Sequence, residues 1–92
     1  MSPVRRTAVI VNEKGLHARA SRLFVTTAAQ FTAQVTVRRD DLVVGADSVL
    51  SVLELAAGRG SEIEIAAEGP DAETAADALA ALVAAGFHEK DG

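Results

Sequence analysis

Hydrophobic and polar positions alternate in two stretches of the chain, residues 31–38 and residues 62–68. This alternation is typical of β-strands that have one buried and one solvent-exposed face. The β-branched and apolar residues 7–11 predict a further strand in the centre of the sheet, and residues 42–44 predict a short returning strand that ends at Gly45. The chain is therefore expected to contain four strands.

Three other segments have apolar residues at helical spacing. The first helix is predicted to begin at Ala18, the second to follow Asp47 or Ser48, and the third to run from Asp71 to about Gly86. Asp and Ser are both residue types that cap helix N-termini. The predicted buried faces are Ala20, Leu23, Phe24, Thr27, Ala28 and Phe31 in the first helix, Val49, Val52, Leu53 and Ala56 in the second, and Ala75, Leu79, Leu82 and Val83 in the third.

The order of these elements, β-α-β-β-α-β-α, predicts an α/β (α+β) fold. Because two strands alternate cleanly, one face of the sheet should be solvated and helices should cover the other. We therefore expect an open-faced β-sandwich in which a four-stranded, mostly antiparallel sheet carries three helices on one face. The 92 residues are too few for two independent cores, so residues 1–92 are expected to form a single domain.

Composition excludes several classes of function. The formal net charge is −4 and aromatic residues make up only 3%, which argues against nucleic-acid binding. The absence of cysteine excludes disulfides, thiolate chemistry and cysteine zinc sites. The longest apolar run, residues 78–85, is far shorter than the roughly 18 residues of a membrane span. The N-terminus lacks a signal-peptide pattern, so we expect no membrane insertion and a cytoplasmic location.

His17 is the residue best placed for chemistry, because it lies between a glycine-containing loop and the start of the first helix. The first N–H groups of a helix lack internal partners and the dipole is positive there, so the backbone of Ala18 and Arg19 could bind a phosphate. The Arg19 side chain could add a charge-assisted contact. The same field disfavours imidazolium, and neutral imidazole can attack phosphorus. Gly15 would let the loop bend close to the ring.

Simpler interpretations remain open from the residues alone. His17 could be an ordinary helix cap, and Arg19 an ordinary surface cation. A small hydrolase that uses His17 would need an acid or nucleophile partner, which the sequence does not identify. The other histidine, His88, lies in a polar C-terminal segment, residues 88–92, where we expect a loose terminus and a solvated side chain. No ligand spacing connects the two histidines, so no metal site is expected.

Two segments carry a resemblance to a known family. Gly15-Leu16-His17-Ala18-Arg19 resembles the active-site signature of the HPr family, the histidine-containing phosphocarrier proteins of the bacterial phosphotransferase system. Residues 45–53, Gly-Ala-Asp-Ser-Val-Leu-Ser-Val-Leu, resemble the regulatory-serine segment of that family. The resemblance covers nearly the whole chain, and the order of elements and the length agree with it.

The resemblance implies a phosphocarrier and not an enzyme. His17 would accept a phosphoryl group at Nδ1 from enzyme I and pass it to an enzyme IIA, in either sugar uptake or a nitrogen-related regulatory branch. Arg19 would help to neutralise the phosphohistidine. No cofactor is implied, and a monomer is expected.

The resemblance also implies regulation and docking around the second helix. Ser48 would match the serine that an HPr kinase/phosphorylase modifies, and Val49, Leu50 and Leu53 would form an apolar docking patch. From the residues alone, Ser48 could be only a cap and the apolar residues only core. A helix this short can hardly bury all of them, so some apolar surface should remain exposed.

The alternative function is a regulatory binding module, controlled by Ser48, that docks to a transcription factor or an enzyme. The presence of His17 argues against this as the only role.

Two departures from the family pattern matter here. Ala20 stands where many members have proline, and alanine is comfortable in a first helical turn. Asp47 stands where many relatives carry lysine or another residue, which could alter recognition by a kinase.

Overall fold

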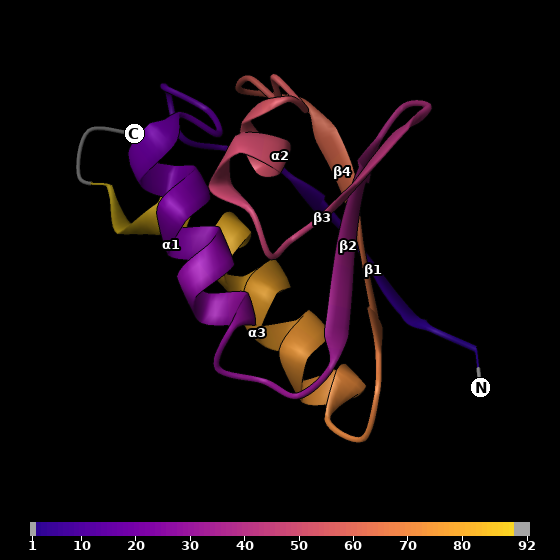
Figure 1. Cartoon of the computed structure of the whole chain (residues 1–92). Helices are drawn as coiled ribbons and strands as arrows, with labels where there is room; N and C mark the ends of the chain where they lie inside the picture. Colours follow the sequence, from indigo (N-terminus) through magenta and orange to yellow (C-terminus); the bar gives the residue numbers. More distant parts are fainter. Residues whose placement is uncertain (1, 90–92) are drawn as a thin grey trace.

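The computed structural model describes residues 2–89, and its elements follow the predicted order. The helices and strands are β1 (Val4–Val9), α1 (Ala18–Ala28), β2 (Gln34–Arg39), β3 (Leu42–Gly45), α2 (Val49–Leu53), β4 (Glu62–Glu68) and α3 (Ala72–Ala84), followed by a 3-10 turn, η1 (Gly86–His88). Figure 1 shows the three helices on one side of the sheet. The predicted fold class is therefore confirmed.

The strands lie in the order β1-β4-β2-β3, and each neighbouring pair is antiparallel. One prediction about the sheet is wrong: the first strand is not central, because β1 lies at an edge and pairs only with β4. It also begins earlier, at Val4, and ends at Val9. Its β-branched and apolar residues suggested a central strand, but Thr7 and Val9 are exposed and Ala8 is buried between them.

The core lies between the sheet and the helices. Val37, Ile63 and Ile65 project from the central strands and are buried, as the alternation predicts. The helices contribute buried residues Ala20, Ser21, Phe24 and Ala28 from α1, Val52 from α2, and Ala72, Ala75, Ala76, Leu79, Leu82 and Val83 from α3. Ser21 is a buried polar residue that the apolar pattern did not include.

The buried face predicted for the second helix is only partly correct. α2 has five residues, Val49–Leu53, and among them only Val52 is fully buried. Val49 and Leu53 are half-buried, and Ala56 lies beyond the helix and is exposed. A helix of little more than one turn can direct only one side chain into the core. In the first helix, Phe31 likewise lies beyond the last residue of α1 and is half-buried.

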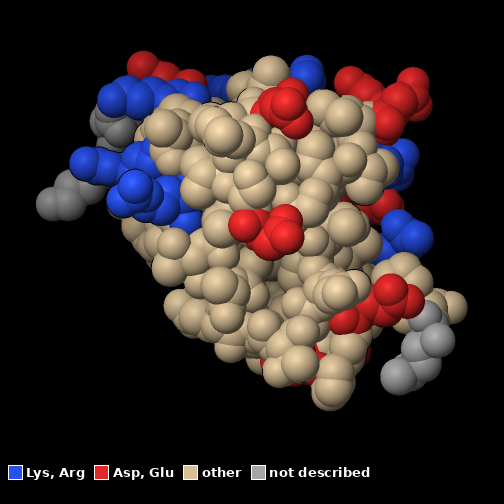
Figure 2. Space-filling model, viewed as in Figure 1, with Lys and Arg blue, Asp and Glu red and all other residues tan. Residues whose placement is uncertain are grey.

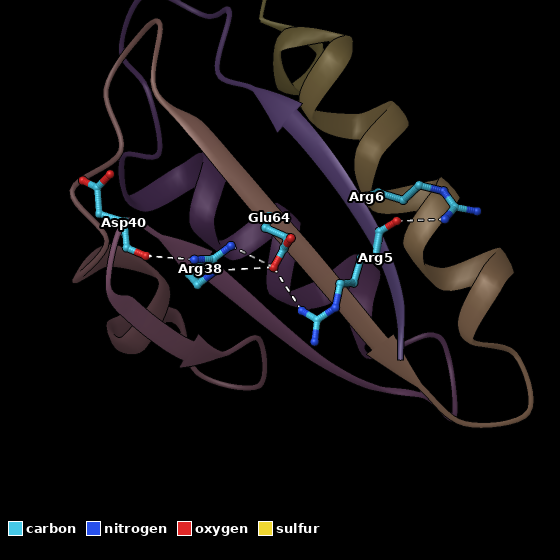
Figure 3. A network of polar contacts seen from close by, with 5 residues as sticks. All are labelled: Arg5, Arg6, Arg38, Asp40 and Glu64. Atoms are coloured by element: carbon cyan, nitrogen blue, oxygen red, sulfur yellow. Dashed lines mark hydrogen bonds and ion pairs between the residues drawn. The ribbon is translucent and has the colours of Figure 1, made fainter. Parts of the chain in front are cut away.

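The open face of the sheet carries a charged network across three strands (Figure 3). Glu64 of β4 accepts hydrogen bonds from Arg5 of β1, at 3.0 Å, and from Arg38 of β2, at 3.2 and 3.3 Å. Arg38 lies directly opposite Glu64 in the register of the sheet. Oppositely charged cross-strand pairs of this kind stabilise antiparallel sheets modestly. The network agrees with the predicted solvation of this face.

The helices are short, and α3 is the longest with 13 residues. Across residues 2–89, none combines the length and the hydropathy that a membrane crossing requires. The same residues contain no group of three or more His, Cys, Asp or Glu side chains arranged to hold a metal ion.

Candidate functional site

His17 is the N-cap residue of α1, as the sequence predicts. Its backbone is extended, with φ −73° and ψ −178°, and its Nδ1 atom accepts a hydrogen bond from the Arg19 backbone N–H at 3.2 Å. The N–H of Ser21 donates to the His17 carbonyl at 2.8 Å. The N–H groups of residues 18–20 therefore precede the first helical hydrogen bond and have no acceptor within the helix. One of them already points at Nδ1.

The loop before His17 is held by backbone contacts. Gly15 has φ +65°, and a Cβ atom at this position would lie 2.6 Å from the Ala57 carbonyl oxygen. The Leu16 N–H donates to that carbonyl at 2.9 Å, and the Ser21 hydroxyl donates to the Leu16 carbonyl at 3.1 Å. Gly15 thus permits a close approach to the segment after α2, whereas the prediction was that it lets the loop bend close to the His17 ring.

The other ring nitrogen of His17 is bound by a carboxylate. Nε2 forms a hydrogen bond with Oε2 of Glu89, and Oε1 of Glu89 accepts a hydrogen bond from the Asn12 side-chain amide at 3.0 Å. The same amide nitrogen donates to the Gly15 carbonyl at 2.9 Å, and Asn12 is fully buried. Neither Glu89 nor Asn12 is among the site residues predicted from the sequence.

These contacts change the acidity of Glu89. The hydrogen bond from His17 and then that from Asn12 lower the pKa of Glu89 below its ordinary value, and electrostatic attraction to His17 and Lys14 acts in the same direction. Partial burial opposes the shift in the pKa of Glu89 but does not cancel it. Glu89 is therefore an anion under ordinary conditions, bound to the ring that it faces.

Cationic residues surround the start of α1 although the chain as a whole is acidic. Lys14, Arg19 and Arg22 are exposed at this end of the helix. Figure 2 shows Lys and Arg side chains gathered at the corner where α1 begins in Figure 1. Lys14, Arg19 and Glu89 line an open hollow around His17. The local charge is therefore suited to an anion such as a phosphoryl group.

The segment around Ser48 lies on the neighbouring helix. Ser48 caps α2, because its hydroxyl accepts a hydrogen bond from the Ser51 N–H at 3.3 Å, and Asp47 does not take that role. Leu50 is 75% exposed, whereas Val49 and Leu53 are half-buried. Exposed apolar surface on α2 is thus confirmed. α2 packs against α1, and Figure 2 shows a broad, mostly uncharged face on this side of the molecule.

Residues 4–85 match the family model of the PTS HPr component phosphorylation site. The chain belongs to the HPr family. It is similar to the phosphocarrier protein HPr of Cupriavidus necator, with 43% identity over 86 residues that cover 94% of this chain and 97% of that protein. It is also similar to the phosphocarrier protein NPr of Shewanella violacea, with 39% identity over 89 residues and coverage of 97% and 98%.

A solved structure supports the same relationship. The crystal structure of HPr-C-His from Thermoanaerobacter tengcongensis superposes with a TM-score of 0.90 and 38% sequence identity, covering 95% of this chain and 98% of that chain. This chain is therefore one of the HPr/NPr phosphocarrier proteins of the phosphotransferase system. In this HPr-family member α1 begins at Ala18 with Ala20 buried in its first turn, so the helix start forms without proline there.

The C-terminal end of this HPr-family chain differs from the loose terminus that we expected. His88 is exposed, as predicted, but Phe87 is buried and Glu89 is bound to His17. Residues 90–92 of the predicted solvated segment lie outside the described residues. An aromatic residue directly after Gly86 was the signal in the sequence that this end of the chain packs against the core.

Proposed function

We propose that this chain accepts a phosphoryl group on Nδ1 of His17 from enzyme I and passes it to an enzyme IIA. The observation that carries the proposal is the position of Nδ1 at the start of α1, where the Arg19 N–H points at it. A phosphoryl group on Nδ1 would replace the lone pair as acceptor for that N–H. Its charge would be stabilised by the helix dipole and by the cations around the hollow.

The transfer is a displacement at phosphorus. The Nδ1 lone pair of His17 forms the new P–N bond, while the bond between phosphorus and the donor nitrogen of enzyme I breaks and its electron pair stays with that nitrogen. The backbone N–H groups of Ala18 and Arg19 and the Arg19 guanidinium would take the phosphoryl oxygens. The same steps in reverse deliver the group to enzyme IIA, so the chain acts as a carrier and does not turn over a substrate.

Partner docking and regulation belong to the same proposal. Leu50 is 75% exposed on α2 and would form the centre of the docking patch, with the half-buried Val49 and Leu53 beside it. Phosphorylation of Ser48 would place a dianion next to this patch and weaken apolar docking. The exposure of Leu50 also favours the alternative of a regulatory binding module, in which docking alone is the function.

A hydrolase is less well supported by the geometry. Glu89 supplies the acid partner for His17 that the sequence did not identify. However, the nearby Ser21 is buried, and its hydroxyl donates to the Leu16 carbonyl, so it is not available as a nucleophile. The carrier therefore remains the proposed function.

The test is phosphorylation of the full chain with radioactive phosphoenolpyruvate and enzyme I. We expect one acid-labile, base-stable phosphoryl group per chain. The His17→Ala variant should lose the label and keep its melting temperature within a few degrees, since a cap contributes about 1 kcal/mol. Arg19→Ala should be labelled more slowly. His88→Asn, which alters the other histidine and tolerates its positive φ, should keep one label per chain. A fully labelled His17→Ala protein would disprove the proposal.

A further inference from the structure

A second hollow, of about 410 Å³, opens where α1 ends, β2 begins and β3 ends. Most of the residues that line it are small or apolar. Ala28, Val35 and Ala46 are buried, whereas Ala29 is exposed and Phe31 is half-buried. Because alanine side chains are short, they leave space between the end of the helix and the strands. This alanine-lined hollow has no part in the function proposed so far.

The carboxylate of Asp47 lies at the rim of the alanine-lined hollow. A Cβ atom on Gly45 would lie 2.8 Å from Oδ1 of Asp47, so the carboxylate occupies the room that glycine leaves. The next residue, Ser48, faces elsewhere, because its hydroxyl accepts a hydrogen bond from the Ser51 N–H at the start of α2. The charge of Asp47 therefore belongs to the hollow and not to the helix cap.

No positive charge of the protein balances this carboxylate. Within the part of the chain that the structure describes, Asp47 forms no ion pair. The last turn of α1 carries no basic residue, so the negative end of the helix dipole adds to the charge of Asp47. Two charged neighbours are acidic as well: Glu68 lies opposite Gln34 in the sheet, and the Asp71 carboxylate accepts the Ala33 N–H at 2.8 Å. The rim is therefore anionic, in contrast to the cationic start of α1.

An apolar hollow with an anionic rim fits a side chain that has an apolar stem and a positively charged head. Lysine and arginine bury their methylene groups in this way and keep the charge at the edge. Arginine fits better, because its planar guanidinium is weakly hydrated, stacks on aromatic rings such as that of Phe31, and pairs with carboxylates. A purely apolar side chain would instead remove water from Asp47 without replacing its hydrogen bonds.

The hollow lies within reach of a protein that docks at His17. Asp47 directly precedes Ser48 and the docking patch, so the rim is continuous with that patch. The 11 residues of α1 span about 16 Å, whereas a standard interface of about 800 Å² per partner is about 30 Å across. Figure 2 shows this face as largely uncharged, with acidic but not basic side chains near its centre. One partner can therefore contact His17, α2 and the hollow together.

We propose that the alanine-lined hollow receives a basic side chain, best an arginine, of a phosphoryl-transfer partner that docks on α2. Its stem packs against Phe31 and Val35, and its head group pairs with Asp47. The hollow thereby selects partners that present a basic group at this place. The identity of the partner rests on the function proposed above, whereas the chemistry of the hollow does not.

The first experiment titrates the full chain with a small probe, N-acetyl-arginine N-methylamide, and follows the amide NMR spectrum. Its counterpart, N-acetyl-citrulline N-methylamide, has nearly the same shape without the charge. We expect the arginine probe to cause saturable shifts at residues 28–36 and 45–47, with a dissociation constant on the order of millimolar. The citrulline probe should bind at least about threefold more weakly.

Two variants with matched controls test the rim and the walls of the hollow separately. Asp47→Asn removes the charge at the rim, and its control Asp41→Asn removes the same charge from the turn between β2 and β3. Ala29→Leu fills part of the hollow, and its control Ala84→Leu adds the same side chain at the exposed end of α3. Asp47→Asn and Ala29→Leu should each weaken binding of the arginine probe about threefold. Both controls should match the wild type.

The second experiment measures docking during phosphoryl transfer. The KM of enzyme I for the chain, and the KM of enzyme IIA for the phosphorylated chain, are compared between Asp47→Asn and Asp41→Asn. Asp47→Asn should raise at least one of the two KM values about threefold and leave kcat unchanged, because the contact forms in docking and not at His17. Asp41→Asn should keep both KM values of the wild type.

The outcomes distinguish this proposal from the carrier function. Equal binding of the two probes, shifts outside the hollow, or two unchanged KM values in Asp47→Asn would disprove the role of the hollow and leave the carrier function intact. Equal effects of Asp47→Asn and Asp41→Asn would also disprove it, because total charge would then be the cause. If His17 is not labelled, the carrier function and the assignment of a transfer partner fail, and the titration still decides whether the hollow binds a basic group.

Discussion

Gly15 and Ala57 are in direct backbone contact, although 41 residues separate them in the sequence. Ala57 lies in the segment between α2 and β4. A Cβ atom on residue 15 would lie 2.6 Å from the Ala57 carbonyl oxygen and 2.8 Å from the Cα atom of Gly58. The Leu16 N–H donates to the same carbonyl at 2.9 Å. This contact joins the loop that positions His17 to the segment that follows the Ser48 helix.

The first prediction is that Gly15→Ala destabilises the chain and slows phosphoryl transfer. The new Cβ atom would clash with Ala57, and the φ of +65° is unfavourable for alanine. We expect a loss of about 2–3 kcal/mol in the free energy of unfolding, measured by urea denaturation. We also expect slower labelling by enzyme I, because the loop before His17 must move.

Gly60→Ala is the matched control for this prediction. Gly60 has φ +90°, but a Cβ atom there meets nothing within 4 Å. Gly60→Ala should lose only about 1 kcal/mol in the free energy of unfolding, from the strained backbone alone. It should keep the wild-type rate of phosphoryl transfer. If Gly15→Ala were no less stable than Gly60→Ala and equally fast in transfer, the contact with Ala57 would have no role in positioning His17.

The second prediction concerns Ser48. Replacing it with alanine removes the acceptor for the Ser51 N–H and should cost about 1 kcal/mol of stability, whereas Ser48→Asp retains an acceptor and should melt close to the wild type. Ser48→Asp should nevertheless be phosphorylated markedly more slowly on His17, because a negative charge lies next to Leu50. Stopped-flow or rapid-quench labelling by enzyme I provides the measurement. Equal rates for the two variants would leave Ser48 as a helix cap only.

The third prediction is that Leu50 contributes to docking and not to folding. Because Leu50 is 75% exposed, Leu50→Gln should change the free energy of unfolding by no more than about 0.5 kcal/mol. It should raise the KM of enzyme I for the chain several-fold. Leu42→Gln is the control, since Leu42 is an exposed leucine on β3, 44% exposed, and outside the docking patch. An equal rise in KM for both variants would contradict a specific role for Leu50.

Several features of this protein could be predicted from the sequence because they depend on neighbouring residues. The alternation of Val35 and Val37 with polar residues, and of Ile63 and Ile65 with glutamates, follows from the two-residue repeat of a strand. The position of His17 at a helix start follows from the loop before it and the helical spacing after it. Strand geometry and helix capping are local properties, so the pattern of residues is sufficient to indicate them.

Other features were decided only by the tertiary structure. The edge position of β1 depends on which strands pair with it, and β1 pairs with β4, more than fifty residues further along the chain. The contact between His17 and Glu89 joins residues that are 72 positions apart, and it forms because Phe87 is buried and turns the backbone toward the loop. Contacts of this kind depend on the packing of the whole core. The burial of residues far apart in the sequence decides which segments lie next to one another. Local propensity carries no information about them.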